Sequence, residues 1–172
     1  MGNMLNVYIT DYDIDEVISY TGEKFNREEV LSLYHRFRQL DKGHKGYLSR
    51  EELLNTVPEL SLNPLATRLA WCFENVNFKE FVKLLAAFSS VADKEDKLRF
   101  IYMIFDVDGD GLVSREDLEH MVRVLCGTSL SEEEVNAVLD QTLQNDTKIS
   151  FDRFQKVFSK PIEMTVEIPA ID

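Results

Sequence analysis

The feature that most constrains this sequence is a twelve-residue acidic loop, residues 106–117, between two segments of helical periodicity. Aspartate stands at its first, third and fifth positions, glycine at its sixth and an apolar residue at its eighth. Ca²⁺ prefers about six to eight oxygen ligands, and a short loop supplies them only by folding back on itself. Gly111 permits the sharp turn because it has no Cβ. The spacing therefore predicts a calcium-binding loop between two helices.

This pattern is typical of the EF-hand, a helix–loop–helix unit. The predicted ligands are the side chains of Asp106, Asp108, Asp110 and Asp117, the Leu112 carbonyl, and Ser114 directly or through water. Asp117 departs from the motif, which has a bidentate Glu at the twelfth position. Because aspartate is one methylene shorter, we expect weaker Ca²⁺ binding and competition from Mg²⁺. The alternative is a solvated acidic turn, and the strict spacing argues against it.

The helix–loop–helix unit occurs four times in the sequence. The twelfth and last loop positions of the four copies are Glu52, Glu80, Asp117 and Arg153. In the first copy, Gly43 and Lys45 replace the third and fifth ligands, and a lysine ammonium at the ion position repels Ca²⁺. The second copy is five residues too short before Val76 to form a loop. In the fourth copy, Arg153 places a guanidinium at the twelfth position, where the motif has a carboxylate. We therefore expect one Ca²⁺ site, at residues 106–117.

The predicted fold class is all-α, with four EF-hand units paired into two lobes and short β-bridges between paired loops. Val113 is expected to form one of these bridges with a neighbouring loop. The predicted divisions are 1–90 for an N-terminal lobe with an N-terminal arm, 91–160 for a C-terminal lobe, and 161–172 for a tail. Only 7 Gly and 4 Pro in 172 residues favour helices joined by short turns.

Composition excludes several function classes. A net charge of −12 repels phosphates and excludes nucleic acid as a partner. No apolar run is long enough to span a bilayer, and no secretory signal opens the sequence. Cys72 and Cys126 lie in apolar helical patterns, which favours buried, reduced thiols and a cytoplasmic location. The three histidines are scattered without a nucleophile or phosphate loop, so we expect no catalytic residues.

The first residues leave two alternatives open. Gly2 after Met1 permits N-myristoylation, which would bring the protein to a membrane surface. The motif prefers Ser or Thr at the sixth position, and this sequence has Asn6. The other interpretation is an N-terminal arm that packs on the body of the protein.

With its four units aligned, the sequence resembles the calcineurin B family, and in particular its calcineurin B homologous protein branch. The resemblance extends over nearly the whole length and lies in strings that calcium chemistry does not require. These are Met1-Gly2-Asn3, Leu40-Asp41-Lys42-Gly43, Pro58-Glu59-Leu60, Asn63-Pro64-Leu65, Asn77-Phe78-Lys79-Glu80-Phe81 and Lys94-Glu95-Asp96-Lys97-Leu98.

The resemblance implies a regulatory subunit that grips an amphipathic helix of a larger protein in a groove across both lobes. In the family that helix belongs to a phosphatase catalytic subunit or to the cytoplasmic stalk of a sodium/proton exchanger. The candidate groove residues are Phe78, Phe81, Leu84, Leu85, Phe88, Met121, Leu125 and Phe158, each of which has a plain core position as its alternative. Family members typically keep the two sites of the second half or more, whereas the fourth loop of this sequence has lost its ligands. The alternative function is therefore a constitutive, calcium-independent structural subunit.

Overall fold

Helices make up nearly all the regular structure of the computed structural model, which describes residues 9–57 and 62–158. The helices are α1 (Asp11–Tyr20), α2 (Arg27–Leu40), α3 (Arg50–Thr56), α4 (Ala66–Cys72), α5 (Phe78–Ala86), α6 (Lys94–Phe105), α7 (Arg115–Cys126), α8 (Glu132–Leu143) and α9 (Phe151–Val157). The strands are β1 (Val113–Ser114) and β2 (Lys148–Ile149). The predicted all-α fold class is confirmed, and in this part of the chain no helix is long and apolar enough to cross a membrane.

The helix that follows each loop begins where the last residues of that loop cap it. Ser49 and Ser114 are N-caps that accept a hydrogen bond from the backbone N–H three residues on, at Glu52 and Asp117. The acidic side chains bond back to the N-cap backbone and complete a capping box. Each acidic residue is also the twelfth residue of its loop. One carboxylate therefore closes the loop and begins the helix.

The loops pair as the repeat predicts. β1 and β2 are antiparallel, with Val113 opposite Ile149, so the third loop pairs with the fourth. The first loop pairs with the shortened second loop through an isolated bridge between Tyr47 and Asn77. Two backbone hydrogen bonds of 2.9 and 2.8 Å link Leu48 to residues 76 and 75 beside that bridge. The predicted β-bridge at Val113 is confirmed.

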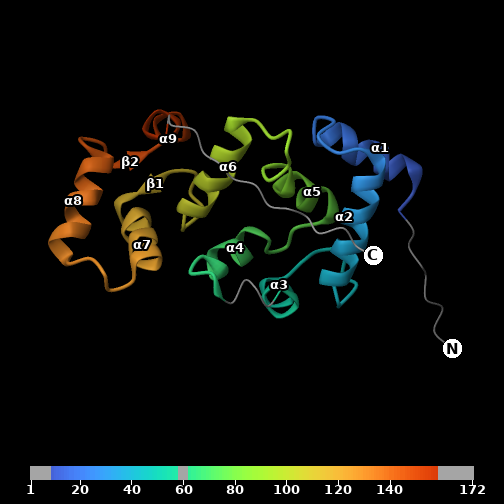
Figure 1. Ribbon diagram of the computed structural model, residues 1–172, viewed down its shortest axis with the longest axis horizontal. Coiled ribbons are helices and arrows are strands. Elements are labelled where there is room, and N and C mark those ends of the chain that lie inside the picture. The colour runs from blue at the N-terminus through green and yellow to red at the C-terminus, as the bar shows by residue number, and fades with distance from the viewer. Residues whose placement is uncertain (1–8, 58–61, 159–172) are drawn as a thin grey trace.

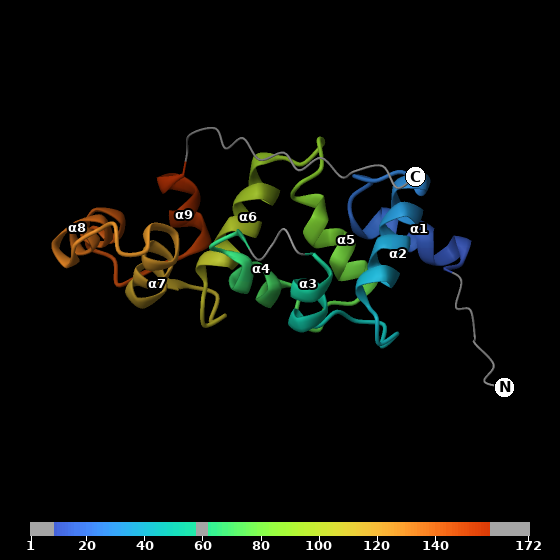
Figure 2. The same cartoon turned by 60° about the horizontal axis from the view of Figure 1, so that its bottom comes forward.

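Two apolar cores share helix α6. Phe100 and Ile104 belong to a core built mainly from α1 to α5, whereas Leu98 and Tyr102 belong to a second core with β1, β2 and α7 to α9. Figures 1 and 2 show α6 between these groups, with α8 at one end of the molecule and α1 at the other. The predicted boundary at residue 90 assigns α6 to the second lobe, but its side chains stabilise both.

The two cysteines differ in environment. Cys72 in α4 is buried, and burial raises the pKa of its thiol to about 11, so it stays protonated and unreactive. Cys126 is exposed at the last position of α7. The expectation that both thiols are buried is therefore wrong for Cys126, because the last turn of α7 is in solvent and the adjacent Leu125 is exposed as well.

Candidate metal centre

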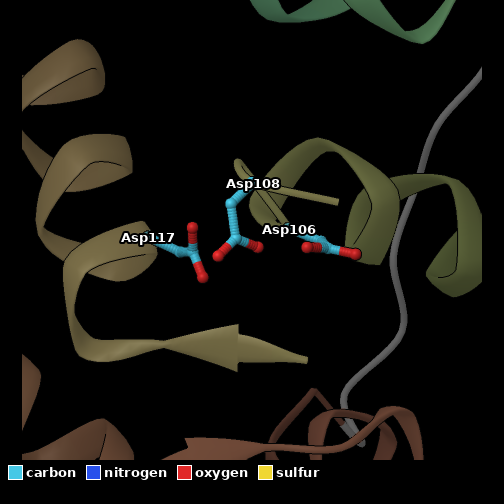
Figure 3. Close-up of side chains that lie close together, drawn as sticks. All are labelled: Asp106, Asp108 and Asp117. Carbon is cyan, nitrogen blue, oxygen red and sulfur yellow. The ribbon is translucent and has the colours of Figure 1, made fainter. Parts of the chain in front are cut away.

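Three of the predicted ligands converge between the end of α6 and the start of α7. Asp106 is the C-cap of α6, Asp108 lies in the loop, and Asp117 is in the first turn of α7. One carboxylate oxygen from each lies within 4.8 Å of the others (Figure 3). Two oxygens bound to one Ca²⁺ at about 2.4 Å can be no more than about 5 Å apart. The spacing therefore fits a single Ca²⁺ ion.

Asp106 has an environment that favours a bound cation. The residue is buried, and its Oδ2 accepts a 2.9 Å hydrogen bond from the Gly111 backbone N–H. Its Oδ1 is buried without a hydrogen-bond partner among the described residues. Burial, together with the charges of Asp110 and Asp108, raises the pKa of Asp106. A buried carboxylate oxygen without a partner is costly, and a Ca²⁺ ion would satisfy it.

Both carboxylate oxygens of Asp117 accept hydrogen bonds from other residues of the loop. Its Oδ2 accepts from the backbone N–H and the hydroxyl of Ser114, at 2.8 and 2.6 Å, and its Oδ1 accepts from the Val107 N–H at 3.1 Å. The longer Glu52 of the first loop reaches the Gly43 N–H, at the third loop position instead of the second. The shorter aspartate thus holds the loop at its second residue. That Asp117 is a weaker final ligand than glutamate stays a prediction.

Of the other predicted ligands, Ser114 Oγ lies 2.6 Å from the Asp117 carboxylate, whereas Asp110 is not part of the carboxylate cluster. Asp110 is exposed and forms an ion pair with Lys148 of β2, and that contact lowers the pKa of the aspartate. Leu112 is exposed, and its N–H donates to Asp110 Oδ1 at 2.8 Å. Sequence reasoning did not single out Lys148. The strand register could have revealed it, because Lys148 lies opposite Ser114.

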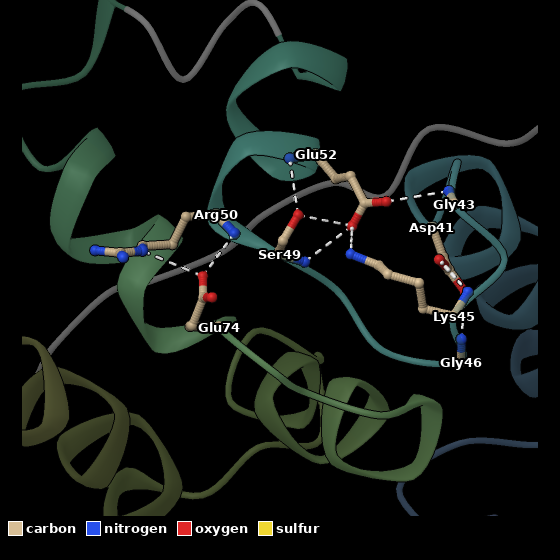
Figure 4. Close-up of polar contacts among 8 residues, drawn as sticks. All are labelled: Asp41, Gly43, Lys45, Gly46, Ser49, Arg50, Glu52 and Glu74. Carbon is tan, nitrogen blue, oxygen red and sulfur yellow. Dashed lines mark hydrogen bonds and ion pairs between the residues drawn. The ribbon is translucent and has the colours of Figure 1, made fainter.

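The first loop is closed by a basic side chain of its own (Figure 4). Lys45 Nζ lies 2.8 Å from Glu52 Oε2, and the buried Asp41 carboxylate accepts the backbone N–H groups of Lys45 and Gly46 at 2.9 and 2.7 Å. The hydrogen bond from Lys45 is the largest cause that lowers the pKa of Glu52, to about 2. The ammonium thus joins the fifth and twelfth positions of the loop, which are both ligand positions in a metal-binding EF-hand.

The fourth loop has a similar internal closure. Arg153, at its twelfth position, donates from Nε to Asp146 at 3.2 Å and from Nη2 to Gln144 at 2.6 Å. These two partners occupy the fifth and third positions, where an active loop has ligands. A guanidinium therefore spans the loop in place of the bidentate carboxylate.

The candidate groove residues fall into different environments. Phe81 and Met121 are buried in the first core, and Phe78, Leu84, Leu85 and Phe88 are half-buried against it. Phe158 packs on the second core with Phe105 and Phe154, whereas Leu125 of α7 is exposed. The structure thus places Met121 in the same core as the candidates of residues 78–88, whereas Leu125 belongs to neither core. Gly2 and the predicted tail, 161–172, lie outside the described residues.

Changing Asp117 to glutamate should tighten Ca²⁺ binding about tenfold and increase the preference for Ca²⁺ over Mg²⁺. The extra methylene lets the carboxylate offer both oxygens to the ion, and Glu52 shows that a glutamate here keeps the bonds to the N-cap serine. Calorimetric titrations with each ion measure the effect. Glu116→Asp changes an exposed neighbour and serves as the control. Equal Ca²⁺ affinity in Asp117→Glu and the unmodified chain would contradict the prediction.

Comparison with known proteins agrees with this architecture. A sequence model of the EF-hand domain pair matches residues 95–159. A calcineurin B subunit of Naegleria gruberi is 37% identical over 148 residues, which cover 80% of this chain and 83% of the relative. The type 1 calcineurin B subunit of Dictyostelium discoideum is 38% identical, over 77% of this chain and 79% of the relative. The calcineurin B subunit of Schizosaccharomyces pombe is 33% identical, with coverages of 81% and 85%.

Proposed function

Because this chain belongs to the calcineurin B family of EF-hand proteins, we propose that it is a non-catalytic regulatory subunit holding an amphipathic helix of a larger protein. Calcium binding is the shared property of such EF-hand proteins, and this chain is a Ca²⁺-binding member. Its relatives are named as subunits, which implies assembly with another chain. We place its single Ca²⁺ site at residues 106–117 and its activity in the cytoplasm.

The observation that supports helix binding is an apolar cavity of about 360 Å³. Its apolar lining comes from α4, α5, α6 and their connections, and consists of Cys72, Val76, Leu84, Ala87, Phe100 and Met103. An amphipathic helix places apolar side chains at i, i+3/i+4 and i+7, and these fill such hollows. Charged side chains of both signs, Lys83, Arg99, Glu80 and Asp96, also line the cavity. They suit the polar flanks of a helix.

Leu84 is the predicted groove residue that lines this cavity. Leu84→Asp should weaken binding of the partner helix at least about tenfold, because it places a charge where an apolar anchor inserts. Val138→Asp is the matched control, since Val138 is a partly exposed apolar residue on α8, away from the cavity. The partner is identified by crosslinking in cells and mass spectrometry, and its helix is then titrated as a peptide. Equal affinities for Leu84→Asp and the unmodified chain would exclude this cavity.

A calcium-independent structural subunit is the second candidate function. The closures of the first and fourth loops by Lys45 and Arg153 favour it, because both loops are held without a metal ion. Titration of the partner helix in Ca²⁺ and in chelator separates the two candidates. A regulatory subunit shows different affinities, since a ligand shifts an equilibrium only by its differential affinity. Acylation at Gly2 stays a proposal, which the mass of the N-terminal peptide from cells would test.

A further inference from the structure

Arg68 of α4 is a buried arginine whose guanidinium lies against the end of α6. It donates to four backbone carbonyl oxygens, those of Met103, Ile104, Asp106 and Val107, at 3.1, 3.0, 2.8 and 3.2 Å. The last carbonyls of a helix have no partner within it, and the helix dipole favours a cation there. Asp106 is also the first residue of the calcium loop. Arg68 therefore holds both the end of α6 and the beginning of the loop.

Trp71, one turn further along α4, extends this contact to the middle of the loop. The Arg68 guanidinium lies over its ring, 4.7 Å from the centroid, in a cation–π arrangement. A Cβ built on Gly109, the fourth loop residue, would lie only 3.2 Å from Trp71 Cη2. The indole thus packs directly on the loop between Asp108 and Asp110. Trp71 remains 37% exposed.

These contacts join the second hand, which has lost its loop, to the third hand, which kept one. We propose that Arg68 and Trp71 form a clamp through which the N-terminal lobe sets the Ca²⁺ affinity of residues 106–117. The inference rests on the Ca²⁺ site proposed above. A loop held at its beginning and middle loses less conformational freedom when an ion binds, so the clamp raises affinity by preorganisation. Because coupling is reciprocal, bound Ca²⁺ also stabilises α4.

Two properties of Arg68 have opposite effects on the affinity of the loop for Ca²⁺. Its four hydrogen bonds hold the loop, whereas its positive charge repels a cation. Arg68→Lys separates them, because lysine keeps the charge but is a compact donor that cannot span four carbonyls. We expect Arg68→Lys to raise the Ca²⁺ dissociation constant about tenfold, the range for residues that support metal ligands. Arg123→Lys makes the same chemical change at an exposed α7 residue paired with Glu119 and Glu132, and should leave affinity unchanged.

The unmodified protein provides a spectroscopic readout of the clamp. Trp71 is the single tryptophan of the chain, so its emission reports the packing of α4 on the loop. Titration with Ca²⁺ should change this emission with the same midpoint that calorimetry gives. Hydrogen exchange supplies a second measurement, in which the amides of residues 66–72 should become more protected with Ca²⁺.

The outcomes separate failure of the clamp from failure of the site. A calorimetric stoichiometry of one, with constant Trp71 emission and equal affinities for Arg68→Lys and Arg123→Lys, would overturn the clamp and leave the site intact. If no Ca²⁺ binds, both proposals are wrong. If Arg68→Lys does not fold, the test is made on the unmodified protein, by Trp71 emission and by hydrogen exchange of residues 66–72. Unchanged emission and unchanged exchange of residues 66–72 on Ca²⁺ binding would then refute the clamp.

Discussion

Replacing Asp106 by asparagine should weaken Ca²⁺ binding by roughly 100-fold or more, beyond the loss expected for residues that only support ligands. Asparagine keeps a carbonyl oxygen for the Gly111 N–H, so the loop retains its internal hydrogen bond. What disappears is the charge of a buried carboxylate whose Oδ1 has no hydrogen-bond partner among the described residues. Calorimetry measures the loss, and Trp71 emission provides an independent titration curve.

Asp110→Asn is the matched control for this experiment. Asp110 is exposed, and its carboxylate is paired with Lys148, so removing its charge should have a smaller effect than the change at Asp106. The same substitution is thus made at two loop positions that differ in burial and partner. If Asp110→Asn lost more affinity than Asp106→Asn, the ion would have to lie toward β2 and away from the cluster in Figure 3.

Changing Gly43 and Lys45 together to aspartate should create a second Ca²⁺ site and raise the stoichiometry from one to two. The first loop already has Asp41, Ser49 and Glu52 at its first, ninth and twelfth positions, and a glycine with positive φ at its sixth. A Cβ at Gly43 would meet only flexible side-chain atoms of Glu52 and Lys45, at 3.3 Å. The two substitutions supply the missing carboxylates and remove the internal ammonium.

Lys45→Met separates the effect of removing the ammonium from the effect of adding carboxylate ligands. It removes the ammonium without adding ligands, so the stoichiometry should stay at one. Calorimetric titration of both variants and the unmodified chain gives the comparison. A double variant that folds, as judged by its circular dichroism, yet still binds one Ca²⁺ would show that Lys45 and Gly43 are not what keeps the first loop without calcium.

Local pattern was sufficient to predict much of the fold and the metal cluster. The spacing of apolar residues predicts the helices, and the position of Val113 in its loop predicts a β-bridge to a neighbouring loop, which the structure forms with Ile149. The spacing of the loop predicts the convergence of Asp106, Asp108 and Asp117, but Asp110, predicted with them, pairs with Lys148 instead. Each of these depends on residues within one helix–loop–helix unit or on the pairing of two similar units. The full ligand set and the groove stay predictions.

Contacts between distant segments could not be read from the same pattern. Arg68 is a charged residue in a helical segment, which favours exposure, yet it is buried. Its hydrogen-bond partners are backbone carbonyls 35 to 39 residues further along the sequence, and no local pattern predicts them. Residues 78–88 are apolar on more than one side of α5, so periodicity alone does not separate the buried Phe81 from Leu84, which lines the cavity. Tertiary packing decides both cases.

Helix α6, whose side chains enter both cores, has a consequence for the cooperativity of unfolding. The first core cannot come apart without displacing Phe100 and Ile104, and these lie on the helix that also carries Leu98 and Tyr102 into the second core. We therefore expect the two halves to unfold as one unit. The free energy gained from an ion in the third loop grows as RT ln(1 + [Ca²⁺]/Kd), and it would then also stabilise the half whose two loops are predicted to bind no ion.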